Sequence, residues 1–175
     1  MPSLRFRLRL LWYRLDKEAC IAALVFGLIL GGLGFLTHAV YASREEAMLR
    51  LHAFHEQNIA CLARNIYFEA RGEPLAGQYA VAEVTMNRKA AASATSTVCG
   101  VVYEKSAFSW TDAATLPEPG GEAWERAHEV AEDVYYGRHE PQLRGARFYH
   151  ADYVKPEWAK EKRRVARIGS HIFYR

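Results

Sequence analysis

Two glutamates, Glu69 and Glu73, lie four residues apart in the stretch YFEARGEP. The residues before them recur at steps of three and four, the spacing of a helix face turned toward a core: Met48, Leu51, His55, Ile59, Leu62 and Ile66. Glu69 is the next position on this face. Burial raises the pKa of a carboxyl group and keeps a general acid protonated near neutral pH. Glu69 is therefore a candidate catalytic acid, and a structural ion pair with Arg64 or Arg71 is the alternative.

The helix that carries Glu69 is predicted to end soon after it. Gly72 suits a left-handed cap, and Pro74 cannot continue the helical hydrogen-bond ladder. We therefore expect Glu73 to lie at or just past the helix end, in wetter surroundings than Glu69.

The N-terminal part predicts one transmembrane helix. Residues 19–41 contain no charged side chain and are long enough to cross a bilayer. Residues 1–18 form a basic tail that carries the whole net charge of +3, which holds this end in the cytoplasm and exports the chain after Ala42. We expect a retained, single-pass signal anchor in the inner membrane, because the apolar run exceeds the usual hydrophobic region of a signal peptide. Cleavage after Ala42 is the alternative.

The exported part has no excess of positive charge, so its composition gives no case for a nucleic-acid partner. Ser43 and Glu46 form a capping-box pattern, which predicts that a membrane-proximal helical segment starts there, within residues 42–60. Further helices are expected at residues 75–92 and 122–136, and strand-like patterns at residues 146–151 and 168–174 predict a small antiparallel sheet.

Cysteine and histidine positions bear on several other chemistries. Cys61 and Cys99 both lie in the exported part, where an oxidising compartment permits a disulfide between them; two unpaired buried thiols are the alternative. A cysteine peptidase would need one of these thiols with His150, and nothing else marks a nucleophile. The sequence has no HExxH motif and no paired-cysteine motif, so we expect neither a metal site nor a cofactor.

Aromatic residues beside a flexible loop favour a carbohydrate substrate. Trp110 closes the triplet FSW and precedes a loop with prolines and glycines at residues 117–121. Aromatic faces stack on the apolar face of a sugar ring, although ordinary core packing is the alternative for any single tryptophan.

Residues 61–175 resemble the SleB-type cell wall hydrolase family, that of the spore-cortex-lytic enzymes. The resemblance rests on several ordered motifs along the chain: CLARNIYFEARGEPLAGQYAVAEVTMNR at 61–88, VCGVVY at 98–103, FSW at 108–110, FYH at 148–150 and IGSHIFYR at 168–175. It implies an α+β, lysozyme-like catalytic domain with a helix-rich lobe and a small antiparallel sheet, here preceded by one transmembrane helix.

The resemblance also implies a reaction. Members of this family act as lytic transglycosylases, which cleave the peptidoglycan glycan strand between N-acetylmuramic acid and N-acetylglucosamine, and Glu69 matches their catalytic glutamate. Six further residues are hypothesised to bind the glycan: Glu73, Gln78, Tyr103, Trp110, Tyr149 and His150.

Two alternatives to this reaction remain open. Simple hydrolysis by water would recruit a second carboxylate, with four candidates: Glu73, Glu83, Asp112 and Asp152. A protein that binds murein without cleaving it, and serves as a membrane anchor for glycan strands, is the other.

Overall fold

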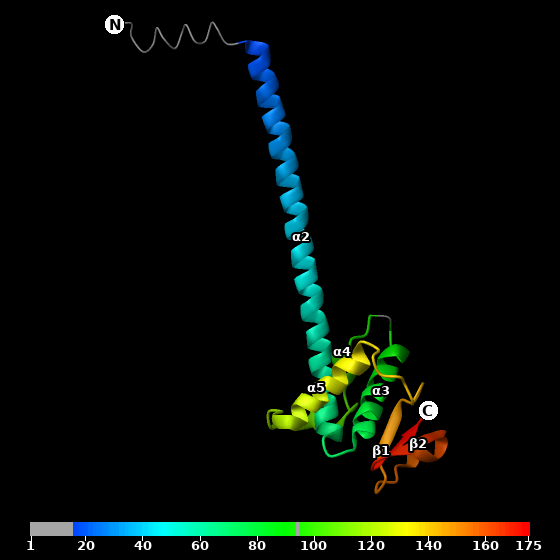
Figure 1. The fold of residues 1–175 in the computed structure, drawn as a ribbon. Helices are drawn as coiled ribbons and strands as arrows, with labels where there is room; N and C mark the ends of the chain where they lie inside the picture. The colour runs from blue at the N-terminus through cyan, green and yellow to red at the C-terminus, as the bar shows by residue number, and fades with distance from the viewer. Residues whose placement is uncertain (1–15, 94) are drawn as a thin grey trace. The chain divides into compact units, whose positions relative to one another are not determined.

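The computed structural model describes residues 16–93 and 95–175, so most of the predicted basic tail lies outside the described residues. Figure 1 shows its helices and strands. The chain divides into two units between Leu51 and His52. Helix α2 (Lys17–Ala70) begins in the first unit and ends in the second.

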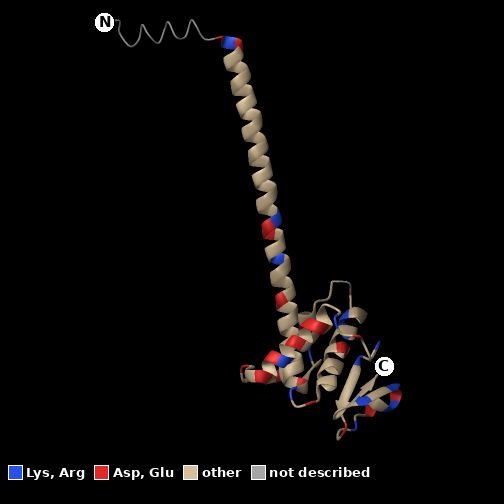
Figure 2. Ribbon diagram, in the orientation of Figure 1, with Lys and Arg blue, Asp and Glu red and all other residues tan. Residues whose placement is uncertain are grey.

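The described part of the first unit is helical and contains a long apolar stretch. No charged residue lies between Glu18 and Arg44, which Figure 2 shows as a continuous tan ribbon. Its large apolar side chains are exposed, and within the described residues this is the one helix long and apolar enough to cross a membrane. The predicted helix start at Ser43 is wrong, because α2 continues through this residue and its hydroxyl donates a hydrogen bond to the Val40 carbonyl.

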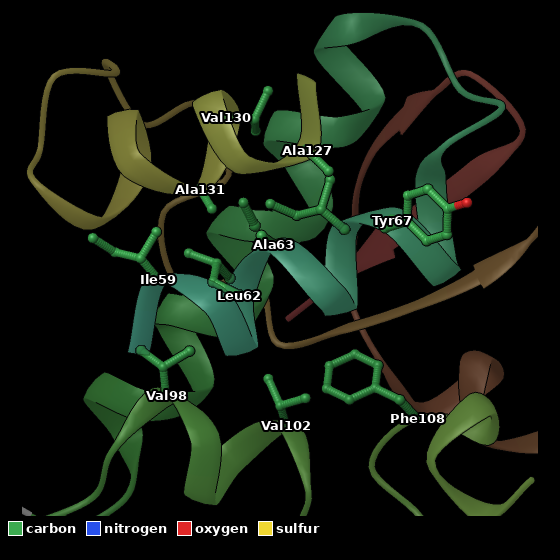
Figure 3. Packing of buried hydrophobic residues seen from close by; sticks show 12 residues of the cluster. Ile59, Leu62, Ala63, Tyr67, Val98, Val102, Phe108, Ala127, Val130 and Ala131 are labelled. Atoms are coloured by element: carbon green, nitrogen blue, oxygen red, sulfur yellow. The ribbon is translucent and has the colours of Figure 1, made fainter. Parts of the chain in front are cut away.

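The second unit is built on the C-terminal turns of α2. Ile59, Leu62 and Ile66 are fully buried, as predicted, whereas Met48 and Leu51 of the same predicted face are exposed. The buried turns pack between two other helices, α4 (Val98–Val102) and α5 (Gly121–Tyr135), as Figure 3 shows. The core therefore holds only the last part of α2, which is the part that carries Glu69.

The connection after α2 differs in detail from the prediction. The helix ends at Ala70 as expected, but Gly72 is not in the left-handed conformation. Pro74 instead precedes helix α3 (Leu75–Ala91), and the Pro74 carbonyl accepts hydrogen bonds from the N–H groups of Gly77 and Gln78. The proline thus separates α2 from α3 by starting the second helix.

A three-stranded antiparallel sheet completes the second unit. Its strands are β1 (Phe148–Ala151), β2 (Arg164–Ile168) and β3 (His171–Tyr174), in the spatial order β1, β3, β2. Two short 3-10 helices lie in the connections, η1 (Ser109–Asp112) and η2 (Glu157–Glu161). One sheet face packs on α3, where Phe173 is fully buried with Ala80 and Val84. The sheet is thereby fixed against the helical core.

Cys61 and Cys99 form a disulfide with their Cα atoms 5.2 Å apart. The disulfide joins α2 to α4. The N–H group of Val98, the first residue of α4, also donates a hydrogen bond to the Asn58 side chain on α2. Closing a loop of this length contributes about 3 to 4 kcal/mol in the chain-entropy model. The covalent bond therefore holds α4 against the helix that carries the candidate acid.

Candidate active site

Glu69 lies in the last turn of α2, half-buried, and receives a hydrogen bond from a residue of the sheet. The Tyr149 hydroxyl on β1 donates to Glu69 Oε2 at 2.9 Å. Burial raises the pKa of Glu69, against the Tyr149 hydrogen bond and the charge of Arg88, which lower it. Burial and the neighbouring carboxylate together raise the pKa of Tyr149 well above its ordinary value, so the phenol remains a hydrogen-bond donor.

Arg88 is the cation of this site, and the sequence analysis did not select it as a site residue. Its guanidinium donates to the carbonyls of Arg147 (2.7 Å) and Ala107 (3.2 Å) and lies over the Phe108 ring. Arg88 follows Val81 and Val84 on the inner face of α3, at steps of three and four, so the same periodicity that selects Glu69 would have found it.

The position of Tyr149 follows from the packing of β1. Asn87, next to Arg88 on α3, donates to the carbonyls of Leu143 and Ala146 and so ties down the segment that enters the strand. Tyr149 pairs in register with the buried Phe173 of β3, on the sheet face turned toward α3. Its hydroxyl is therefore held against Glu69 by α3 and β3 together.

Three aromatic side chains gather on the turn of α2 next to Glu69. Trp110 stacks on Phe68 with ring centroids 4.8 Å apart, and the Tyr103 ring meets Trp110 edge to face. The Trp110 N–H donates to Asn65, a buried residue one turn earlier on α2. The structure thus brings together two of the predicted sugar-binding residues, Tyr103 and Trp110, with Phe68 as a member that the sequence analysis did not select.

Glu73 is held by the β2–β3 turn and is not open to solvent. Its side chain is 13% exposed, and both the N–H and the hydroxyl of Ser170 donate to it, with His171 nearby. Burial alone would raise the pKa of Glu73, but the Ser170 hydrogen bonds and the His171 charge outweigh it and lower the pKa. Glu73 lies just past the end of α2, as predicted, and donors of the protein stabilise its ionised form.

The two remaining predicted binding residues, Gln78 and His150, bond to groups other than the carboxylate of Glu69. Gln78 is buried and donates to the Glu73 carbonyl. His150 follows Tyr149 on β1 and so lies on the opposite sheet face, where its ring stacks on Tyr174 and bonds to the Tyr174 hydroxyl. Both residues have contacts of the kind that stabilise the fold.

The other carboxylates named as possible partners of Glu69 are engaged elsewhere or exposed. Glu83 is buried against His139 and accepts a hydrogen bond from the Leu143 N–H, and Asp152 pairs with Arg167. Asp112 is exposed on η1. Within residues 16–93 and 95–175, no group of three potential ligands is arranged to hold a metal ion.

A cleft of about 740 Å³ adjoins the site. Tyr149 and Arg88, the two neighbours of Glu69, lie in its wall. Loop residues 104–107, the end of α3 and the segment from Arg147 to Lys162 supply the rest of the lining. The arrangement as a whole supplies one carboxyl group of raised pKa, a donor, a cation, an aromatic surface and a cleft.

Comparison with known proteins shows which family this chain resembles in sequence. A family model described as Cell Wall Hydrolase matches residues 72–174, beginning three residues after Glu69. Spore cortex-lytic enzymes of Bacillus cereus and Bacillus subtilis are 32% and 33% identical over 70% and 69% of this chain. The matched regions cover 46% and 38% of those proteins, so the chain aligns with less than half the length of these curated relatives.

Two solved structures share the fold. The catalytic domain of the Bacillus cereus SleB protein is 30% identical, with a TM-score of 0.58 over 69% of this chain and 91% of that one. The catalytic domain of a germination-specific lytic transglycosylase, SleB from Bacillus anthracis, is 32% identical, with a TM-score of 0.54 over 67% and 93%. The helix-rich unit with its three-stranded sheet is thus the fold of these domains.

Proposed function

This chain belongs to the cell wall hydrolase family, and from that premise we propose that it cleaves the glycan strand of peptidoglycan as a lytic transglycosylase. Glu69 is the single catalytic acid and base of the proposed reaction. The observation that carries the proposal is a carboxyl group of raised pKa, fixed by Tyr149 beside a cleft and an aromatic surface. A structural ion pair would instead lower the pKa of Glu69.

The proposed reaction balances without a cofactor. Protonated Glu69 gives its proton to the oxygen that links N-acetylmuramic acid to N-acetylglucosamine, and the bond from the muramyl anomeric carbon to this oxygen breaks. The C6 hydroxyl of the same muramyl sugar closes on the anomeric carbon. The ionised Glu69 accepts the hydroxyl proton, which leaves a 1,6-anhydro sugar and restores the acid.

Tyr149 and Arg88 assist the ionised state of Glu69 in this scheme, and burial assists the protonated state. Each favours the ionised carboxylate that forms after the first proton transfer, because one donates a hydrogen bond and the other carries a positive charge. Burial favours the protonated form that starts the reaction. Three of the four candidate second carboxylates, those of Glu73, Glu83 and Asp152, are bound to other groups of the protein, which supports an intramolecular acceptor over a second catalytic carboxylate.

We also propose that residues 19–41 anchor the protein in the inner membrane as a single-pass helix, with the catalytic domain on the outer side of that membrane. The support is an apolar helical stretch without charges behind a basic N-terminal sequence. Peptidoglycan strands would then be the partner, within reach of a membrane-bound enzyme.

The full chain in a nonionic detergent, incubated with purified peptidoglycan, tests the reaction. We expect anhydromuropeptides from the wild type and none from Glu69→Gln, because the amide keeps the shape and removes the proton. Glu125→Gln, at an exposed position on α5, is the matched control and should cleave normally.

Mass spectrometry of the released fragments separates the alternatives. Products heavier by one water would assign the protein to the hydrolysing muramidases. Bound glycan with no soluble fragments from the wild type would support the non-catalytic anchor and overturn the proposal.

A further inference from the structure

The cleft beside the candidate acid is strongly cationic. Its lining contains a single carboxylate, that of Glu104, and four basic side chains: Arg88, Lys105, Arg147 and Lys162. Ion pairs would neutralise such a surface, but across residues 16–93 and 95–175 no carboxylate lies within ion-pair distance of these four side chains. The cleft therefore presents an excess of positive charge, with Glu104 in its wall and Glu69 acting on Arg88 as the nearby negative groups.

An aromatic ring positions two of these cations. The Lys162 ammonium lies 3.7 Å from the centre of the Phe148 ring, and the Arg147 guanidinium lies 6.0 Å from it. Trp158 packs against the same ring and also lines the cleft. Cation–π contacts restrict long basic side chains that are otherwise mobile, so less entropy is lost when an anion binds.

The cleft adjoins the candidate acid through two shared neighbours, Tyr149 and Arg88. The Tyr149 hydroxyl donates a hydrogen bond to Glu69, and the positive charge of Arg88 lowers the pKa of Glu69. Both residues also form part of the cleft wall. A substituent carried by the sugar that reacts at Glu69 would therefore enter this cleft. In peptidoglycan, the muramyl sugar bears the stem peptide, which carries several carboxylates.

We propose that the cleft binds the carboxylates of the stem peptide on the muramyl sugar at Glu69. This inference rests on the proposed function and specifies its substrate class: glycan strands that still carry anionic peptides. A volume of about 740 Å³ admits a short peptide, and cations on separate segments suit several carboxylates better than one. Phe148 and Trp158 offer apolar contact to the peptide backbone and side chains.

Three substrates test the proposal with the full chain in detergent. They are native peptidoglycan, peptidoglycan whose peptide carboxylates have been converted to neutral amides, and strands stripped of peptide, which keep only the lactyl carboxylate. We expect kcat/KM for native material to exceed both others by about tenfold, the scale of one lost charged contact. Added salt should reduce this preference, because it screens the cleft.

Variants locate the preference in the cleft. The double variant Lys162→Gln, Arg147→Gln should cut native peptidoglycan more slowly and bring the three substrates to nearly equal rates. Lys155→Gln, at an exposed position outside the cleft lining, is the matched control and should keep the preference. Cosedimentation of the Glu69→Gln variant with native and amidated material measures the same preference as binding, without turnover.

The outcomes distinguish this inference from the proposed function. Equal cleavage of native, amidated and stripped strands by the wild type would overturn the peptide-binding cleft and leave the transglycosylase in place. A double variant that keeps the wild-type preference would also overturn it. No cleavage of any of the three would overturn the proposed function, and this inference with it.

Discussion

At the scale of the residue, the proposed reaction places two opposing demands on Glu69. The acid must be protonated to give its proton, so burial and a raised pKa help the first step, whereas the carboxylate formed next needs stabilisation. Tyr149 and Arg88 supply that stabilisation without reversing the effect of burial. The direction of the Glu69 pKa thus reports a balance between burial and two specific neighbours.

Removal of the Tyr149 hydroxyl tests this balance. In Tyr149→Phe, Glu69 loses the hydrogen bond that favours its ionised form, so its pKa should rise further. Activity requires the protonated acid, so the alkaline limb of the kcat/KM profile should move to higher pH. Weaker stabilisation of the carboxylate should lower kcat/KM by about tenfold.

The pH dependence of kcat/KM on peptidoglycan measures both effects. Tyr153→Phe, at a tyrosine that is 83% exposed, should leave the profile unchanged. A limb that stays in place or moves to lower pH in Tyr149→Phe would show that Tyr149 does not stabilise the Glu69 carboxylate.

At the scale of secondary-structure elements, the Glu73 side chain connects two segments: it lies between α2 and α3 and accepts hydrogen bonds from the β2–β3 turn. The turn contains Gly169, with φ of 57°, followed by Ser170, whose N–H and hydroxyl both point to Glu73. A β-carbon at position 169 would collide with the Glu73 carboxylate, so the close approach requires glycine. The second glutamate of the EARGE motif therefore positions elements, while the first bears the chemistry we propose.

Glu73→Gln should destabilise the fold in a pH-dependent way. The folded state lowers the pKa of Glu73. The Glu73 carboxylate therefore stabilises the fold fully at pH values above its ordinary pKa of 4.5, and this stabilisation is lost as the pH falls through the lowered pKa of the folded state. At neutral pH we expect a loss of about 1 to 2 kcal/mol, the worth of a charged hydrogen-bond pair. The deficit should shrink in acid, where the wild-type carboxylate is itself protonated.

Thermal unfolding of both chains across this pH range measures the deficit. Glu161→Gln, at an exposed carboxylate on η2, is the control and should unfold like the wild type. A deficit in Glu73→Gln that is constant with pH, or absent at neutral pH, would contradict the role of the Glu73 charge.

At the scale of the whole molecule, the apolar stretch of α2 is the part that we propose anchors the protein in the membrane. We expect the full chain, produced in a Gram-negative cell, to remain in the membrane fraction after alkaline carbonate extraction, because a spanning helix is not released by pH. The catalytic domain should be digested by protease added to spheroplasts. A soluble chain that begins at Ser43 would instead identify residues 1–42 as a cleaved signal peptide.

The sequence by itself determined the features that depend on local periodicity and composition. The steps of three and four that bury Ile59, Leu62 and Ile66 also bring Glu69 into the core, and Pro74 marks the helix boundary. The uncharged run of residues 19–41 identifies the candidate membrane helix in the same way. These properties follow from neighbours along the chain, which a linear pattern contains.

Only the tertiary structure decided the partners of each charged group. Tyr149 is 80 residues from Glu69, and Ser170 is 97 residues from Glu73. Alternation along β1 predicts that Tyr149 and His150 face opposite ways, but the packing of the sheet on α3 selects the face that meets the acid. Contacts between distant residues depend on how helices and strands pack in three dimensions, and that packing set the pKa of both glutamates.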